Sequence, residues 1–275
     1  MSSRLKLPTR NGSVVGLVAV PLFVIALVLV ALFKTHPVVH SAPTSNTIAL
    51  PSSPPAPEKM DFARLRAEMV ARTIKARGIK TPRVLDAMNA VKREEFVSDR
   101  LKSAAYEDNP LPIGAGQTIS QPYIVALMVD AMKITPTDRV LDIGTGCGYA
   151  AAVMGHLAHE VHSVERVPEL GEAARERLGR LGYKNIEVYI GDGSLGLPEQ
   201  APFDAIAVAA SGPRIPVTLV NQLVEGGRIV IPVENTMGFQ DLLVGTKQGD
   251  KLKVEDLGGV RFVPLIGQEG YLTPS

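Results

Sequence analysis

The stretch Val140-Leu-Asp-Ile-Gly-Thr-Gly-Cys-Gly148 is the most informative part of this 275-residue chain. Its apolar start, Val140 to Ile143, predicts a buried strand, its three glycines predict a turn, and a helix is expected to begin near Tyr149. Glycines at alternate positions let the backbone approach a ligand closely because they carry no Cβ. Asp142 is expected at the carboxyl end of the strand, where open α/β sheets bind their ligands.

A second acid, Glu165, follows the next apolar run, Val161 to Val164. If the two runs form neighbouring strands, Asp142 and Glu165 lie at the same edge of the sheet. An acid at that edge can bind both hydroxyls of a ribose. The two acids therefore predict a nucleoside site, whereas the glycines alone would fit a tight turn in any α/β protein.

The spacing of the glycines narrows the choice of ligand. The dinucleotide pattern G-x-G-x-x-G would need glycine at Tyr149, whereas this chain has Gly144, Gly146 and Gly148. The stretch also has no P-loop lysine. We therefore expect a nucleoside without phosphates, for which S-adenosylmethionine is the obvious candidate. A nicotinamide-dependent oxidoreductase built on the same sheet is the alternative, and the missing third glycine argues against it.

Apolar runs alternate with helix-length segments, which is typical of βαβ units and a parallel sheet. Before them, apolar spacing predicts one helix that ends at Gly78 and another that begins at Pro82. Only the turn Gly249-Asp250 separates the last two runs, which therefore predict an antiparallel pair. The sequence predicts a Rossmann-like α/β fold with helices on both faces of a mostly parallel seven-stranded sheet. Its strands are expected at Val140–Ile143, Val161–Val164, Ile186–Ile190, Ala205–Ala209, Arg228–Ile231, Leu242–Thr246 and Lys253–Phe262.

The third of these strands ends in Ile190-Gly-Asp-Gly193, an acid between two glycines. Asp192 is well placed to meet an adenine amino group, although the same residue type also forms ordinary turns. The cofactor-binding residues that we expect are Asp142, Gly144, Thr145, Gly146, Gly148, Glu165, Asp192 and Gly193.

The composition excludes several other classes of function. A formal charge of +1 and a pI of about 7.9 imply no strong attraction to nucleic acid. The single cysteine, Cys147, excludes an internal disulfide and a Cys-rich metal site, and we interpret it as a small residue of the loop. His156, His159 and His162 show no metal-ligand spacing and are expected at the surface, so no metal site is predicted.

The N-terminal part of the chain differs from the rest. Within a tail of residues 1–36, residues 14–33 are apolar and uncharged, and a helix of about 20 such residues can span a bilayer. A cleaved signal peptide is less favoured, because the run is long and no good A-x-A site follows it. Residues 37–59 are rich in Pro and Ser and predict a linker. The folded domain is expected to comprise residues 60–275.

Two further segments give the chain a resemblance to a known family. Ala105-Tyr-Glu-Asp-Asn-Pro-Leu-Pro-Ile-Gly-Ala-Gly-Gln-Thr-Ile-Ser-Gln-Pro-Tyr123 and Arg261-Phe-Val-Pro-Leu265 resemble the protein-L-isoaspartate O-methyltransferase family, and the likeness extends from Met69 to Leu272. The resemblance implies that Ser120 is the catalytic serine. It also implies substrate contacts at Gln117, Thr118, Ile119, Val263 and Pro264. Glu234 and Ser211-Gly212 depart from the usual family pattern, which affects loop details.

The resemblance also implies the reaction. Such an enzyme transfers a methyl group from S-adenosylmethionine to the free α-carboxylate of L-isoaspartyl residues in damaged proteins and peptides, and the ester then collapses to a succinimide. The acceptor is already an anion at neutral pH, so no general base is needed to activate it. Catalysis should come mainly from orientation and from the exclusion of water.

Ser120 has two interpretations, which are compatible. It could cap the helix expected after Pro122, or its hydroxyl could donate a hydrogen bond to the substrate carboxylate at a helix N-terminus that favours anions. A covalent serine intermediate is not expected, because no His and Asp partners accompany it.

Two other functions remain as alternatives besides the oxidoreductase. One is a catalytically silent, membrane-anchored protein that binds damaged polypeptides, for which a broken cofactor loop would be expected. The other is a methyltransferase for small molecules, which the Gln117–Pro122 segment disfavours.

The expected location depends on the N-terminus. Arg4, Lys6 and Arg10 precede the apolar run and would place the domain outside the cytoplasm, as an inner-membrane anchored protein with a periplasmic domain. The cofactor, however, is made inside the cell, and a start at Met60 would yield the domain without anchor or linker. We favour a cytoplasmic, monomeric catalytic domain.

Overall fold

The computed structural model describes residues 60–272. The apolar run 14–33 and the linker 37–59 lie outside the described residues, as do residues 273–275. Among the residues that are described, no helix is both long enough and apolar enough to cross a membrane.

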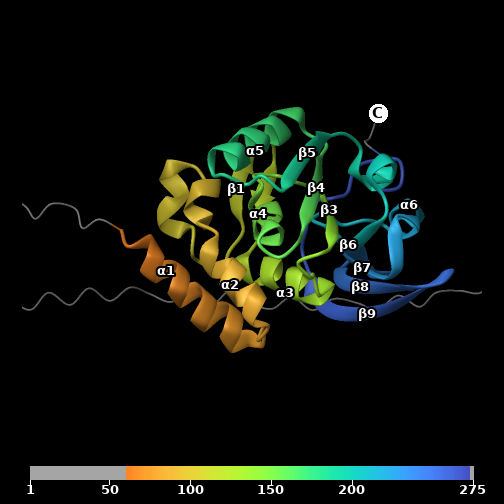
Figure 1. The fold of residues 1–275 in the computed structure, drawn as a ribbon, viewed down its shortest axis with the longest axis horizontal. Coiled ribbons are helices and arrows are strands. Elements are labelled where there is room, and N and C mark those ends of the chain that lie inside the picture. Colours follow the sequence, from red (N-terminus) through yellow and green to blue (C-terminus); the bar gives the residue numbers. More distant parts are fainter. Residues whose placement is uncertain (1–59, 273–275) are drawn as a thin grey trace, which may run out of the picture. The chain divides into compact units, whose positions relative to one another are not determined.

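A seven-stranded sheet forms the centre of the fold, as predicted (Figure 1). Its strand order is β5-β4-β3-β6-β7-β8-β9. The five strands β5, β4, β3, β6 and β7 pair in parallel with their neighbours in this order, and β8 pairs antiparallel with both β7 and β9. The bounds are β3 Arg139–Ile143, β4 Glu160–Glu165, β5 Ile186–Ile190, β6 Phe203–Val208, β7 Leu223–Glu234, β8 Gln240–Gln248 and β9 Lys251–Val260.

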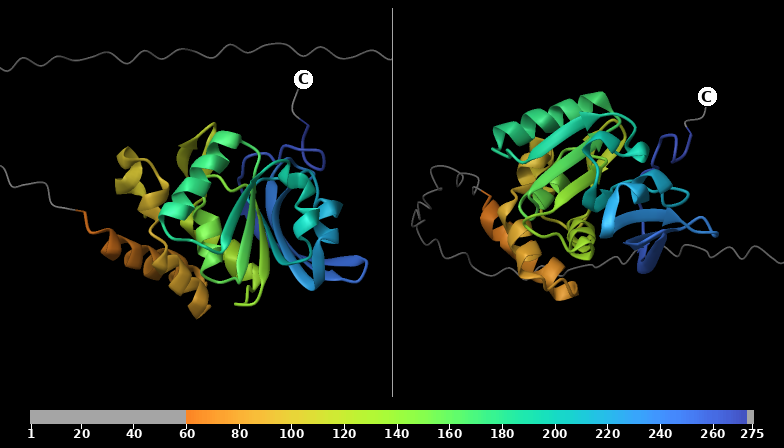
Figure 2. Two further views of the ribbon diagram at one scale, coloured as in Figure 1. Left: turned by 45° about the horizontal axis from the view of Figure 1, so that its top comes forward. Right: turned by 45° about the vertical axis from the view of Figure 1, so that its right-hand side comes forward.

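Both faces of the central strand β3 are covered by other elements. Val140 packs into a cluster with residues of α3 (Pro122–Met132) and α4 (Tyr149–Gly155). Leu141 points to the opposite face, into a cluster that includes Leu219 of α6 (Val217–Asn221). Burial on both faces explains a continuous apolar run rather than an alternating one. The views in Figure 2 show helices on both sides of the sheet, which confirms that prediction.

The remaining helices follow the predicted pattern. The first, α1 (Phe62–Glu68), continues without a break through Met69–Ile74 and Lys75–Arg77. It ends at Gly78, whose φ of 105° is the left-handed conformation that suits glycine at a helix end. Pro82 begins the second helix, as predicted. This second helix is α2 (Pro82–Ala90), and α5 (Pro168–Arg180) follows β4.

A small hairpin outside the main sheet was not predicted. Strands β1 (Leu111–Gly114) and β2 (Gln117–Ile119) pair antiparallel. The turn between them contains Ala115 and Gly116, both with positive φ. These strands are short and carry Pro112 and Gly114, so their composition gives no strand signal. The hairpin leads directly into Ser120.

Strand β7 is longer than its predicted range of 228–231. Phe203 of β6 pairs with Leu223, and Ala205 pairs with Arg228, so the ladder contains a bulge. Gly226 lies in this bulge with a φ of 77°. The two adjacent glycines, Gly226 and Gly227, therefore lie inside the strand. Strand β9 ends at Val260, two residues before the predicted end.

Candidate active site

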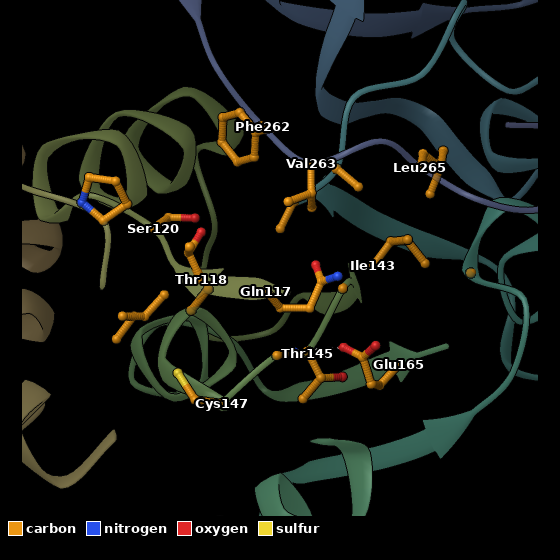
Figure 3. A pocket seen from close by; sticks show the side chains of 18 of the residues that line it. Gln117, Thr118, Ser120, Ile143, Thr145, Cys147, Glu165, Phe262, Val263 and Leu265 are labelled. Atoms are coloured by element: carbon orange, nitrogen blue, oxygen red, sulfur yellow. Dashed lines mark hydrogen bonds between the residues drawn. The ribbon is translucent and has the colours of Figure 1, made fainter. Parts of the chain in front are cut away.

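A cavity of about 1010 Å³ opens at the carboxyl ends of β3 and β4. The glycine loop, the end of β4, the β1–β2 hairpin, the start of α3 and the chain after β9 contribute to its wall. Figure 3 shows Ser120 and Thr118 at the left, Phe262 and Val263 above them, and Gln117 near the middle with Thr145 and Glu165 below it. The predicted site residues that line it are Gln117, Thr118, Ile119, Ser120, Gly144, Thr145, Gly146, Glu165, Gly193, Val263 and Pro264.

The glycine loop forms one wall of the cavity. Gly144 and Gly146 line it with φ values of 95° and 53°, a conformation that side chains rarely adopt. A Cβ on Gly146 would lie 3.1 Å from Cδ1 of Ile113, which belongs to β1. The hairpin thus packs against the loop. Gly148 does not line the cavity, because it lies at the N-terminus of α4 against Leu178.

Glu165 is held in place by the backbone around it. The residue is 6% exposed, and its Oε2 accepts a hydrogen bond from the backbone N of Gly146 at 2.8 Å. Its Oε1 accepts one from the backbone N of Val167 at 2.9 Å. A carboxylate has about four acceptor positions. Glu165 therefore fixes the glycine loop and keeps acceptor capacity for ligand hydroxyls.

Asp142 lies beside the loop but does not line the cavity. Its Oδ2 accepts a hydrogen bond from the Ser163 hydroxyl at 2.7 Å, and that hydroxyl also lies 2.6 Å from Thr145 Oγ1. Its Oδ1 has no hydrogen-bond partner among the described residues. Asp142 and Ser120 both border a second cavity of about 20 Å³. The other residues that line this cavity are apolar and lie in α3, in α4 and at the end of β6.

Burial determines the charge state of Asp142. The residue is completely buried, and this desolvation raises the pKa of its carboxyl to about 6. The Ser163 hydrogen bond lowers the pKa and the nearby Glu165 charge raises it, both by less than burial does.

Asp192 contacts the protein rather than the cavity. Its Oδ1 accepts hydrogen bonds from the Ser194 backbone N at 2.9 Å and from the Ser194 hydroxyl at 2.6 Å. Its Oδ2 accepts one from the backbone N of Gln268 at 2.8 Å. Asp192 thus anchors the chain that follows β9, and its neighbour Gly193 is the member of this pair that lines the cavity.

Ser120 does not cap the helix that follows it, so that part of the prediction is wrong. Helix α3 begins at Pro122, and Gln121 occupies the cap position. The capping acceptor comes instead from Asp108, whose Oδ1 accepts a hydrogen bond from the backbone N of Tyr123 at 3.0 Å. The Ser120 hydroxyl forms no hydrogen bond to another residue of the described part of the chain and faces the cavity in Figure 3.

The opposite wall is a short extended segment after β9. The backbone N of Ser211 donates to Val263 O, and the backbone N of Leu265 donates to Ser211 O, both at 2.8 Å. Pro264 pairs with Ser211 in a parallel bridge. This connection to the end of β6 fixes Val263 and Pro264 across the cavity from Ser120.

Two arginines that line the cavity were not predicted as site residues. Arg166 follows Glu165, and Arg261 precedes the Val263 segment. Their positive charge favours anionic ligands. A lone arginine in a loop has no distinctive spacing, although Arg261 lies in one of the segments that carried the resemblance.

The expectation that the histidines lie at the surface is only partly correct. His162 is buried rather than at the surface, and its ring nitrogens lie 3.1 Å from Tyr189 OH and 3.1 Å from Glu160 Oε1. Within residues 60–272 no cluster of His, Cys, Asp and Glu could hold a metal ion.

Comparisons with known proteins agree on one family. A family model described as Protein-L-isoaspartate(D-aspartate) O-methyltransferase (PCMT) matches residues 64–270. Protein-L-isoaspartate O-methyltransferase 2 of Pelobacter propionicus is 54% identical over 207 residues, which cover 75% of this chain and 92% of the relative. Protein-L-isoaspartate O-methyltransferase of Protochlamydia amoebophila is 52% identical over 208 residues, which cover 75% and 99%.

Solved structures agree with the sequence matches. A protein-L-isoaspartate O-methyltransferase matches with a TM-score of 0.68 and 31% identity, covering 74% of this chain and 66% of that one. A Plasmodium falciparum structure, described as a protein-L-isoaspartate O-methyltransferase in complex with S-adenosyl-L-homocysteine, has a TM-score of 0.64 and 28% identity over 73% of this chain and 98% of its own. The chain therefore belongs to the protein-L-isoaspartate(D-aspartate) O-methyltransferase family.

Proposed function

We propose that this chain uses S-adenosylmethionine to methylate the free α-carboxylate of L-isoaspartyl residues in damaged proteins and peptides. Family membership supports the reaction. The observation that carries it in this chain is that one cavity is lined by Gly146 and Glu165 as well as by Ser120 and Val263. A cofactor and a peptide can therefore meet in one cavity.

The chemistry needs little from the protein beyond placement. When bound, the cofactor would supply an electrophilic methyl group for a carboxylate oxygen of the substrate, with S-adenosylhomocysteine as the leaving group. The resulting ester closes to a succinimide without enzymatic help. The protein contributes orientation and exclusion of water, which can account for much of the rate of such a transfer.

The glycine loop and its acids fit the cofactor. Gly144 and Gly146 leave room for close approach of the backbone, and Glu165 keeps acceptor positions for ribose hydroxyls. Thr145 and Gly193 line the same part of the cavity. We assign Asp142, Gly148 and Asp192 to this group as well. In the structure they hold the loop, the start of α4 and the chain after β9.

The substrate side is formed by the hairpin and the segment after β9. Ser120 would donate its hydroxyl hydrogen to the α-carboxylate. Gln117, Thr118 and Ile119 would flank the peptide on one side and Val263 and Pro264 on the other, since all of them line the cavity. The oxidoreductase and the silent binder find no support in the comparisons.

We further propose that the catalytic domain acts in the cytoplasm as a monomer, with neither nucleic acid nor metal as a partner. Cofactor synthesis inside the cell supports this location. Membrane association through residues 14–33 would apply only if translation begins at Met1 rather than Met60. Mass spectrometry of the native N-terminus tests this point, and a peptide that spans residues 55–64 would exclude a start at Met60.

The reaction is tested with methyl-labelled S-adenosylmethionine and paired peptides that differ only in Asp or isoAsp. We expect label in the isoAsp peptide, released as methanol when the ester collapses, and none in the Asp peptide. Equal labelling of both peptides, or labelling of neither, would contradict the proposed substrate.

A further inference from the structure

Asp108 joins three segments of the chain at the edge of the cavity. Its Oδ2 accepts hydrogen bonds from Nη1 of Arg77 at 2.8 Å and from Nε2 of Gln121 at 2.6 Å. Its Oδ1 accepts one from the backbone N of Tyr123 at 3.0 Å. The carboxylate, whose side chain is 24% exposed, thus links the end of the first helix to the start of α3.

Helix α3 takes its N-terminal capping bond from Asp108 rather than from the side chain of its own cap residue, Gln121. Gln121 occupies the cap position without a side-chain capping bond, and Pro122 has no N–H to donate. A carboxylate at this end also interacts favourably with the helix dipole. Because Ser120 immediately precedes Gln121, Asp108 fixes the turn that carries the Ser120 hydroxyl.

Asp108 is itself held on two sides. The guanidinium carbon of Arg77 lies 3.4 Å from the centre of the Tyr123 ring, so Arg77 contacts both Asp108 and the residue that Asp108 caps. Arg93, which is fully buried, donates to Ala105 O at 2.8 Å and to Asn109 O at 3.4 Å. These two bonds hold the chain on either side of Asp108.

We propose that Asp108 is a positioning residue for methyl transfer, which holds the Ser120–Gln121 turn so that the Ser120 hydroxyl meets the substrate carboxylate. The inference rests on the proposed function of Ser120. Asp108 does not line the cavity, whereas Ser120 and Gln121 do, so its effect passes through the turn. Small displacements of a positioned group can cost about 100-fold in rate.

The first test is Asp108→Ala in the full chain. We expect kcat/KM for the isoAsp peptide to fall about 10- to 100-fold. The dissociation constant and the binding stoichiometry of S-adenosylhomocysteine, measured by calorimetry, should stay unchanged. The stoichiometry serves as the control for folding, because misfolding would lower it. Asp99→Ala is the matched control, since Asp99 is 95% exposed and contacts Lys102 within its own helical turn. It should behave as wild type.

A double-mutant cycle with Ser120→Ala shows whether Asp108 acts through Ser120. We expect the double variant to be no slower than Ser120→Ala alone. If Asp108→Ala fails to fold, Asp108→Asn replaces it, because the amide oxygen keeps an acceptor for Tyr123 N, whereas the amide NH2 can accept from neither Arg77 nor Gln121.

The outcomes separate the two proposals. The positioning role would be overturned if the activity losses of Asp108→Ala and Ser120→Ala multiplied in the double variant, or if Asp108 variants were as active as Asp99→Ala. Either result would leave isoAsp labelling by wild type and the activity loss in Ser120→Ala intact. A wild-type protein that labels no isoAsp peptide would instead remove the proposed function, and this inference with it.

Discussion

At the scale of single residues, the site separates groups that reach the ligand cavity from groups that support it. Ser120 and Glu165 line the cavity, whereas Asp142 and Asp192 bond to neighbouring protein groups and do not. All four were expected in one site, and the structure brings them to the same edge of the sheet.

Ser120→Ala should slow methyl transfer without affecting the cofactor. A hydrogen bond to a charged group contributes about 1.5–3 kcal/mol, so kcat/KM for an isoAsp peptide should fall about 10- to 100-fold. Steady-state kinetics measure this fall, and calorimetry with S-adenosylhomocysteine should give the wild-type dissociation constant. An equal loss of cofactor affinity would mean that the serine has a structural role.

Glu165→Ala should weaken cofactor binding, because both the ribose contacts and the bond to the Gly146 N–H are lost. Charge-assisted hydrogen bonds of this kind predict a dissociation constant raised about 10- to 100-fold in calorimetry. Glu169→Ala is the control, an exposed acid in the first turn of α5. Unchanged affinity in Glu165→Ala would refute the ribose assignment.

Asp142 should make the ligand-free protein less stable as the pH rises. Its pKa is raised from 3.8 to about 6, so between these values the folded protein holds a proton that the unfolded chain releases. The free energy of unfolding therefore falls as pH rises through this window, by about 3 kcal/mol at most. Denaturant unfolding of wild type and Asp142→Asn between pH 4 and 7 measures it. The difference between the two should change with pH, and parallel profiles would contradict the assignment.

At the scale of elements, the β1–β2 hairpin and the glycine loop form one unit. The hairpin contributes Ile113, whose side chain lies beside Gly146. It also contributes the residues that immediately precede Ser120. Movement of either element would therefore disturb both the cofactor side and the substrate side of the cavity.

Gly146→Ala tests this coupling. The substitution strains a positive φ, at about 1 kcal/mol, and places a Cβ 3.1 Å from Ile113. Gly182→Ala is matched, because its φ is 87° and nothing lies within 4 Å of its Cβ. Thermal unfolding should show similar destabilisation in both variants, whereas only Gly146→Ala should weaken S-adenosylhomocysteine binding. Similar affinities in the two variants would mean that the loop tolerates the contact.

At the scale of the whole molecule, the buried core runs from Met69 to Leu265 and includes both faces of the sheet. This core lies within residues 60–272 and supplies the contacts of a folded domain.

A chain that begins at Met60 should therefore keep the melting temperature and the isoAsp-specific activity of the full protein. The shorter chain retains the buried core and every residue that lines the cavity, because all of these residues follow Met60. Differential scanning calorimetry and the labelling assay compare the two chains in detergent-free buffer. Loss of cooperative unfolding in the shorter chain would show that residues 1–59 contribute to the fold.

The sequence alone determined the sheet, the position of the glycine loop and the family, because these depend on local patterns: apolar runs, glycine spacing and the Ala105–Tyr123 segment. It placed the strands of the main sheet within a few residues, except for β7, whose bulge depends on pairing with β6, and it did not predict the β1–β2 hairpin. Only the tertiary structure decided that Asp108 rather than Ser120 caps α3, and that Asp142 is buried away from the cavity. These outcomes depend on which side chains meet across long sequence separations and on how much water they exclude, and neither quantity is encoded in the spacing of nearby residues.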